Sequence, residues 1–261
     1  MQPPWLYCSD LQTGTLTLPE AQARHARLSL RLRPGDAVVL FDGRGRTARA
    51  AIAADEPAAA GAKPAARRRG RAGGPIIAVE AISDIPAPAR TLTIIVGGCK
   101  GTRLDWMVEK CTELGVTGLI FAGFERSVVR VGSGHLEKLR RLCIEACKQC
   151  GRAWLPEISA VSALDQAIAQ VAGAVLLLAD LSPTAEPLAT ALQRHSCSPR
   201  IVAVVGPEGG LTEKEHSLLR DCGAQPVRLA QHVLRVETAA VALAAGFAAI
   251  QPPPAHPPAA R

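Results

Sequence analysis

The sequence predicts an α/β protein in which a small β domain precedes a larger region of alternating strands and helices. Short β-prone runs without helical periodicity occupy roughly the first eighty residues. From about residue 85 onward, apolar strands alternate with amphipathic helices. Pro86 and Pro88 interrupt both patterns, so we place the domain boundary between residues 84 and 85.

The expected strands of the first domain are short and separated by turn residues. The sequence DGRGR at residues 42–46 supplies a glycine-containing hairpin turn between two of them. A small barrel is the simplest way to close so many short strands. The strands are expected at Thr15–Leu18, Ala37–Phe41, Thr47–Ala53 and Pro75–Ile82, with a short helix over Pro19–Leu28.

Residues 54–74 differ in composition from their surroundings. Ala, Gly, Pro and Arg dominate, and Lys63 and four arginines are accompanied only by Asp55 and Glu56 as acidic residues. Without apolar periodicity we expect a disordered insertion in a hairpin, either a solvated spacer or a basic tether for RNA. The proline-rich residues 251–261 are likewise expected to be a disordered tail.

The second domain, over residues 85–250, shows strand and helix patterns in turn. The helix Arg103–Leu114 presents its apolar residues on one face and ends at Gly115. A second amphipathic helix covers Leu136–Cys150. Buried strands are expected at Thr91–Val96, Thr117–Phe121, Ala174–Ala179, Ile201–Val205 and Pro226–Leu229.

Composition limits the class of protein. With 48% hydrophobic residues in 261, the chain can bury a substantial core, but no apolar run is long enough to span a bilayer. The N-terminus lacks the basic start and apolar block of a secretory signal, so we expect a cytoplasmic protein. A net charge of +7 favours a polyanionic partner without identifying it.

Several cofactor classes are disfavoured by spacing. Cys143, Cys147 and Cys150 have the CxxxCxxC spacing of an iron–sulfur site, but they fall on the apolar stripe of a predicted helix, which favours core packing. The histidines show no metal-ligand spacing, so we expect no metal site. The GGCKGT sequence at 97–102 lacks the Walker spacing, and no GxGxxG follows a strand.

The stretch Ile201–Thr238 is the best candidate for the cofactor half of an active site. The strand Ile201–Val205 ends abruptly in GPEGG, whose glycines allow a ligand to approach the main chain. Thr212 and Glu215 then form a capping box for the following helix. For GPEGG alone, an ordinary strand, turn and helix is an almost equal alternative.

Five motifs occur in order along the chain. They are CKGTRLDWMVEKCTELGV at 99–116, FERSVVR at 124–130, EACKQCGRAWLPEI at 145–158, VVGPEGGLTEKE at 204–215 and VLRVETAAVALAA at 233–245. They resemble the successive motifs of the RsmE-type family, bacterial 16S ribosomal RNA (uracil-N3)-methyltransferases of the SPOUT superfamily. HARLSLRLRPGDAVVLFDGRG at 25–45 also resembles the first domain of that family.

This resemblance implies a fold, a reaction and partners. The fold would be a PUA-like, RNA-binding β-barrel over 1–84 and a SPOUT methyltransferase domain over 85–250 with a C-terminal trefoil knot. The protein would bind S-adenosylmethionine in the knot, act as a homodimer, and methylate a uridine of 16S ribosomal RNA or of the small ribosomal subunit. The alternatives are a SPOUT-type enzyme for another RNA position and an inert RNA-binding protein. Ala230 and Val236 depart from the glycine and threonine usual in the family.

The motifs also suggest residue roles. Arg235 cannot act as a base, but its guanidinium can stabilise negative charge developing on the uracil oxygens. Glu237 can accept the N3 proton, or it can simply interact with the helix dipole. Cofactor contacts are expected from Leu178, Leu181, Gly206, Pro207, Glu208, Gly209, Gly210, Leu229, Val233, Leu234 and Thr238, and phosphate contacts from Arg31, Lys100, Arg103, Arg126, Arg130 and Arg152.

Overall fold

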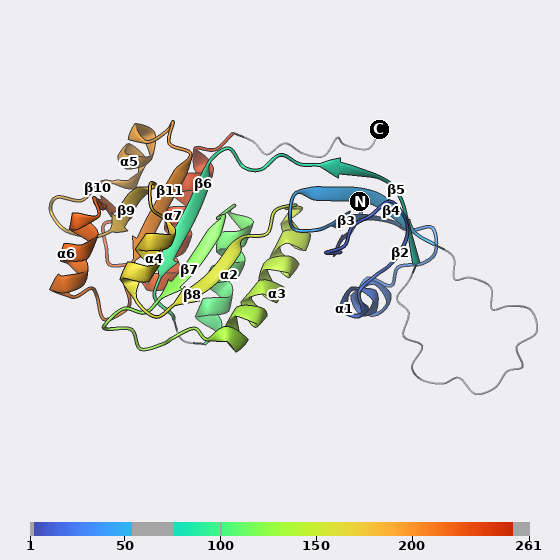
Figure 1. Cartoon of the computed structure of the whole chain (residues 1–261), viewed down its shortest axis with the longest axis horizontal. Helices are drawn as coiled ribbons and strands as arrows, with labels where there is room; N and C mark the ends of the chain where they lie inside the picture. The colour runs from blue at the N-terminus through green and yellow to red at the C-terminus, as the bar shows by residue number, and fades with distance from the viewer. Residues whose placement is uncertain (1–2, 54–75, 100, 253–261) are drawn as a thin grey trace, which may run out of the picture. The chain divides into compact units, whose positions relative to one another are not determined.

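The computed structural model describes residues 3–53, 76–99 and 101–252, which form two compact units (Figure 1). The first unit holds the described residues up to Ala87 together with Gly151–Trp154. The second holds Pro88–Cys150 and the described residues from Leu155 onward. Lys100, the predicted insertion at 54–74 and the predicted tail from residue 253 lie outside the described residues.

The described part of the first unit is built on a five-stranded sheet with the strand order β1-β3-β4-β5-β2. β1 is parallel to β3, whereas the other neighbouring strands are antiparallel. Leu6, Leu40 and Ile77 are fully buried in its core. The elements are β1 (Trp5–Tyr7), β2 (Gly14–Thr17), α1 (Glu20–Arg24), a π-helical turn (His25–Ser29), β3 (Ala37–Phe41), β4 (Arg46–Ile52) and β5 (Ile76–Asp84).

The turn between β3 and β4 follows from its sequence. Asp42 Oδ1 accepts hydrogen bonds from the backbone N–H groups of Arg44 and Arg46, at 2.7 and 3.0 Å. Gly45 has a φ of +92°, which a residue with a side chain rarely adopts. The glycine-containing hairpin turn predicted at residues 42–46 is therefore confirmed.

The second unit contains a parallel sheet that is covered on both faces. Within the described residues this sheet has seven strands in the order β10-β12-β9-β11-β6-β7-β8. β11 lies between β9 and β6, so the direction in which successive strands are added reverses at this point. The strands are β6 (Thr91–Val96), β7 (Gly118–Ala122), β8 (Glu157–Val161), β9 (Val175–Ala179), β10 (Glu186–Pro187), β11 (Arg200–Val205) and β12 (Gln225–Arg228).

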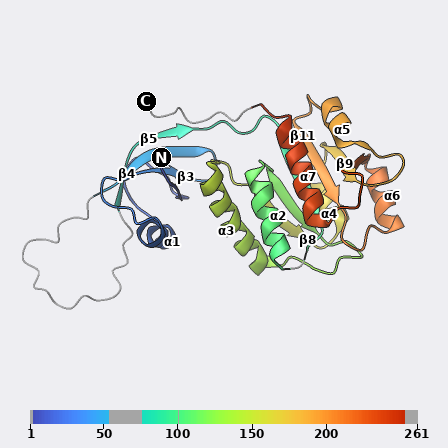
Figure 2. The ribbon, with the colours of Figure 1, turned by 180° about the vertical axis from the view of Figure 1, so that it is seen from behind.

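Helices pack on both faces of this sheet. Figure 2 shows α2, α3 and α7 on one face, where they form a core with α5. α4 and α6 pack against the other face. The helices are α2 (Thr102–Glu113), α3 (Ser133–Cys150), α4 (Leu164–Gln170), α5 (Leu188–Arg194), α6 (Glu213–Asp221) and α7 (Val236–Ala249).

Two further predictions about helices can be compared with the structure. The capping box of α6 is confirmed, because Thr212 Oγ1 accepts from Glu215 N–H while Glu215 Oε2 accepts from Thr212 N–H at 2.8 Å. Cys143 and Cys147 are buried on α3 as predicted, but Cys150 is exposed, because it is the last residue of the helix and lies beyond the packed face. Among the described residues, no helix has the length and apolarity needed to cross a membrane.

Candidate active site

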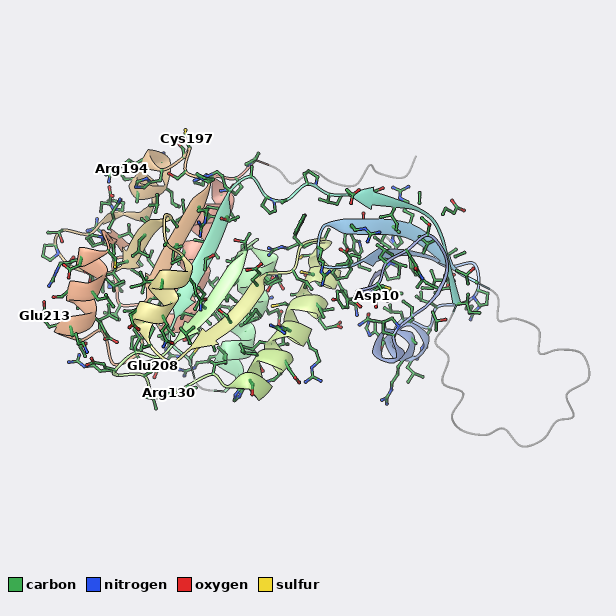
Figure 3. All side chains as sticks on the ribbon, viewed as in Figure 1. Asp10, Arg130, Arg194, Cys197, Glu208 and Glu213 are labelled. Atoms are coloured by element: carbon green, nitrogen blue, oxygen red, sulfur yellow. The ribbon has the colours of Figure 1, made fainter. Side chains whose placement is uncertain are left out.

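A pocket of about 660 Å³ lies in the second unit, where three parallel strands end. The segments after β9, β11 and β12 supply most of its walls. Ligands of open parallel sheets bind at this edge, next to the point where the strand order reverses. Figure 3 shows Glu208 and Arg130 at this edge. The lining residues are Arg103, Ala179, Asp180, Leu181, Val205, Gly206, Pro207, Glu208, Gly210, Leu211, His216, Leu229, Ala230, His232, Val233, Leu234, Arg235, Val236 and Ala239.

The GPEGG loop after β11 is a tight turn whose main chain faces the pocket. Gly210 N–H donates to Pro207 O at 2.8 Å, which closes the turn. Gly210 has a φ of +73°, so this position requires glycine. A Cβ on Gly206 would lie 3.1 Å from the Leu211 side chain. The loop therefore exposes backbone rather than side chains to a ligand at these positions.

Gly209 faces a neighbouring segment and is not among the lining residues. A Cβ at this position would lie 2.9 Å from Cβ of Arg126 and 3.1 Å from its carbonyl oxygen. Arg126 Nη1 in turn donates to the carbonyl oxygens of Gly209 and Leu211, at 3.3 and 3.4 Å. Gly209 thus allows the close approach of Arg126, a residue that the sequence suggested as a phosphate contact.

Arg103 lies on α2 between two carboxylates. Its guanidinium is 3.8 Å from Glu208 of the GPEGG loop and 3.7 Å from Glu237 of α7. Glu208 is half exposed, whereas the Glu237 side chain is 8% exposed. Glu237 Oε2 is buried and has no hydrogen-bond partner within the described residues. A buried acceptor without a donor is costly, so in the described part of the chain this side-chain oxygen stands out as unsatisfied.

Cys99 follows β6 and is buried close to the same charged groups. Burial raises the pKa of its thiol to about 11, and the carboxylates of Glu237 and Glu208 add to the shift. A raised pKa keeps the thiol protonated at neutral pH, which makes it a poor nucleophile. The site therefore offers no activated cysteine at this position.

The structure brings most of the predicted cofactor residues together. Those lining the pocket are Leu181, Gly206, Pro207, Glu208, Gly210, Leu229, Val233 and Leu234. Leu178 is buried in the core between the sheet and α4 and α6, and Thr238 is exposed on α7; neither lines the pocket. Arg235 does line it and is the N-cap residue of α7, where its carbonyl oxygen accepts from Ala239 N–H at 2.8 Å.

The predicted phosphate-binding residues are distributed over both units. Arg103 lines the pocket, and Arg126 and Arg130 are exposed on the segment after β7. Arg31 and Arg152 belong to the first unit. Arg31 is exposed and has a φ of +53°, a backbone conformation that is rare for a residue other than glycine.

Several lining residues lie outside the segments 178–181, 206–210 and 229–234, where cofactor contacts are expected from the sequence. Leu211 and His216 are the two that come after the GPEGG loop, and Val205, Val236 and Ala239 also belong to this group. Leu211 directly follows the GPEGG loop, so its position was a usable signal. His216 is on α6 and carries no such signal.

Comparisons with known proteins identify both parts of the chain. An RNA methyltransferase domain model matches residues 86–248, and an RNA methyltransferase PUA domain model matches residues 18–58. The chain is 33% identical over 237 residues to the ribosomal RNA small subunit methyltransferase E of Synechocystis, covering 88% of this chain and 72% of that protein. It is 30% identical over 245 residues to the enzyme of the same name from Mycobacterium tuberculosis, covering 89% and 86%.

Two solved structures of methyltransferases are similar to this chain over most of its length. The crystal structure of a ribosomal RNA small subunit methyltransferase E from Neisseria gonorrhoeae, bound to S-adenosyl methionine, has a TM-score of 0.78 at 27% identity and covers 95% of this chain and 98% of that one. A probable rRNA-methyltransferase from Porphyromonas gingivalis has a TM-score of 0.76, also at 27% identity, over the same shares. The predicted fold class, a PUA-like β domain followed by a SPOUT-type α/β domain, is confirmed. The chain belongs to the RNA methyltransferase family that includes the ribosomal RNA small subunit methyltransferases E.

Proposed function

We propose that this protein is an S-adenosylmethionine-dependent methyltransferase that methylates N3 of a uridine in the 16S ribosomal RNA of the small ribosomal subunit. The observation that carries the proposal is the pocket at the ends of β9, β11 and β12, which is formed by the loops of the matched methyltransferase domain. The relative from Neisseria gonorrhoeae, which shares this fold, has S-adenosyl methionine bound.

The pocket residues suit such a cofactor. The volume of about 660 Å³ is within the range of small-molecule sites. Leu211, Leu229 and Leu234 offer apolar surface to an adenine ring, while Asp180 and Glu208 offer acceptors for hydroxyl or amino groups. When bound, S-adenosylmethionine would supply a methyl group attached to a positively charged sulfur.

The residues of this chain would align the reactants and bind the charge that develops. In-line transfer depends mainly on holding the nucleophile and the methyl carbon in register within a dry pocket. Uracil N3 is on the base-pairing edge, so the base must be unpaired or flipped to enter. Arg235 lines the pocket and has the donors to stabilise negative charge on the uracil oxygens as the N3 proton leaves.

Glu237 is our candidate for the group that accepts this proton. Its Oε2 is a buried acceptor without a hydrogen-bond partner in the described part of the chain. Its other oxygen, Oε1, lies 3.7 Å from Nε of Arg103, which does line the pocket. The same carboxylate also holds Arg103 in place when the site is at rest.

The remaining features of the proposal concern the assembly. Arg31, Lys100, Arg126, Arg130 and Arg152 are proposed to contact phosphates, and the net charge of +7 supports a polyanionic substrate. We propose that the protein acts as a homodimer in the cytoplasm, with its C-terminal segment threaded as a trefoil knot around the cofactor. The exposed Val233, at 83%, and Leu181, at 46%, beside the pocket support a second subunit closing the site.

The decisive test uses radiolabelled S-adenosylmethionine and small ribosomal subunits from cells that lack this methylation. Transfer of label, followed by nuclease digestion and mass spectrometry, should yield N3-methyluridine. Naked 16S ribosomal RNA, run in parallel, shows whether the assembled subunit is required. Absence of methyl transfer to both substrates, with the cofactor bound, would leave an RNA-binding protein instead.

A mixing experiment tests whether the site is shared between subunits. Arg235→Ala and Arg31→Ala are each expected to be inactive, and activity is measured against the ratio in which they are mixed. If the two defects fall on opposite sides of a shared site, mixed dimers recover activity. An active isolated monomer would contradict this arrangement.

A further inference from the structure

Glu215 is a buried carboxylate that joins two segments far apart in the sequence. Its side chain belongs to the first turn of α6 and is one of the buried charged residues of the described chain. Oε2 accepts from Thr212 N–H at 2.8 Å and from Thr212 Oγ1 at 3.1 Å, and Oε1 accepts from Glu125 N–H at 2.9 Å. Glu215 therefore ties the end of the GPEGG loop to the segment after β7.

The bond to Glu125 is not part of helix capping. A capping box needs only the reciprocal bonds between Thr212 and Glu215, and these use Oε2. The second oxygen reaches a residue 90 positions earlier in the chain. Since both oxygens of a buried carboxylate are used, the side chain fixes the distance between the two segments.

A second contact joins the same two segments. Arg126, next to Glu125, donates from Nη1 to Gly209 O and Leu211 O. A Cβ on Gly209 would lie 2.9 Å from Arg126 Cβ, which shows how closely the two main chains approach. The second half of the loop, residues 209–212, is therefore held against residues 125 and 126 by two separate side chains.

The contacts of Glu215 and Arg126 together form a brace between the two segments, and neither of these two side chains lines the pocket. Gly206, Pro207, Gly210 and Leu211 do line it, but Glu215 and Arg126 do not. We infer that Glu215 is a positioning residue of the proposed cofactor site, which it serves by holding the loop against Glu125 and Arg126. The inference rests on the proposed function, because it takes S-adenosylmethionine as the ligand of that loop.

Substitution of Glu215 should weaken cofactor binding even though the residue does not line the pocket. In Glu215→Gln one oxygen becomes an NH2 group, which then faces a donor, either Glu125 N–H or the N–H and hydroxyl of Thr212. We expect the dissociation constant of S-adenosylhomocysteine, measured by calorimetry, to rise about tenfold, the scale of one lost hydrogen bond to a buried charge. The KM for S-adenosylmethionine should rise similarly, with kcat at saturation changed less than about twofold.

Two control variants separate the brace from ordinary helix capping. Glu213→Gln removes the same charge from the same turn of α6, but Glu213 is 80% exposed and paired with Arg220. Thr212→Val removes the capping hydroxyl and leaves the bond from Glu125 N–H to Glu215 in place. Both controls should bind S-adenosylhomocysteine within about twofold of the parent, because the brace persists.

Arg126→Ala removes the second contact of the brace, the bonds from Arg126 to Gly209 O and Leu211 O. Because Arg126 is exposed, we expect this variant to fold. Its affinity for S-adenosylhomocysteine should fall about threefold, and this result decides the matter if Glu215→Gln does not fold. Unchanged affinity in Glu215→Gln, or an equal loss in Glu213→Gln, would overturn the inference. Failure of the parent protein to bind S-adenosylhomocysteine would instead overturn the proposed function.

Discussion

Two loops, one after β11 and one after β12 on either side of β9, line the same pocket, but they are held very differently. Residues 206–212, after β11, are fixed by the internal bond from Gly210 to Pro207, by Arg126 and by Glu215. For residues 230–234, after β12, no side-chain hydrogen bond to another segment exists within the described structure. Val233 at the tip of this second loop is 83% exposed.

This difference indicates that the two loops contribute to binding in different ways. A loop with several cross-segment bonds is formed before the ligand arrives, and its shape is part of the fold. A loop without them is drawn from the least stable part of the protein and is ordered by what it binds. Substitutions in the first loop should therefore act through its shape, and substitutions in the second through lost contacts with cofactor, RNA or a second subunit.

The largest effect is expected at Arg235, where the second loop meets α7. Arg235→Ala should lower methyl transfer by about a hundredfold or more, the scale seen when a donor to developing charge is removed. Binding of S-adenosylhomocysteine should stay within a few fold, so that turnover and affinity separate. Arg228→Ala, in an exposed arginine of β12, is the matched control and should keep its activity. A normal rate in Arg235→Ala would contradict the assignment.

The second largest effect is expected at Gly209, and a variant of Val233 in the second loop allows the two loops to be compared directly. Gly209→Val places side-chain atoms where Arg126 already lies 2.9 Å from the Cβ position, so residues 206–211 must shift. We expect a loss of cofactor affinity of at least about thirtyfold, because a displacement of about 1 Å in a positioned site is sufficient for this. Val233→Ala, in the second loop, should change affinity by no more than about threefold. Calorimetric titration of both variants with S-adenosylhomocysteine makes the comparison.

The first loop shows which structural features can be predicted from sequence alone. The continuous apolar run Ile201–Val205, the glycines after it and the Thr212 and Glu215 pair predicted strand, turn and capped helix because each depends on neighbours in sequence. The pairing of Glu215 with Glu125 depends on strand order in space. A capping glutamate has the same local sequence whether or not its second oxygen is used.

The same reasoning explains which pocket residues were anticipated. Gly206 and Leu229, at the carboxyl ends of predicted strands, could be assigned from the motifs around them, and both lie at the edge where parallel strands end. Leu178 lies within β9, where alternate side chains point to opposite faces and periodicity in a buried strand cannot tell them apart. The short helices α4 and α5, of seven residues each, offered too few turns for a clear pattern.

A smaller effect distinguishes the pocket from the basic surface. RNA affinity should fall at least about tenfold between about 50 and 200 mM salt, because phosphate contacts release counterions. Cofactor affinity should change by less than about twofold over the same range, since no row of phosphates with condensed counterions is bound in the pocket. Filter binding and calorimetry on the same preparation measure the two dependences. A flat salt response of RNA binding would count against the assignment of the exposed arginines.

The smallest effect is on stability, and it completes the comparison of the loops. Leu211, in the first loop, is partly buried against the core beneath α6, whereas Val233 is almost fully exposed. Leu211→Ala should lower the free energy of unfolding by about 1–2 kcal/mol, less than for a fully buried leucine. Val233→Ala should change it by less than about 0.5 kcal/mol, as expected for an exposed side chain away from structural contacts.

Urea unfolding followed by far-ultraviolet circular dichroism suits this measurement, because the long helices α2, α3 and α7 all belong to the second unit. The comparison should be made at several protein concentrations. If Val233→Ala destabilises the protein more as concentration rises, the side chain is covered by a second subunit, and the apparent freedom of this loop belongs to the isolated chain. If the two variants lose equal stability at every concentration, the distinction between a preformed and a ligand-ordered loop is wrong.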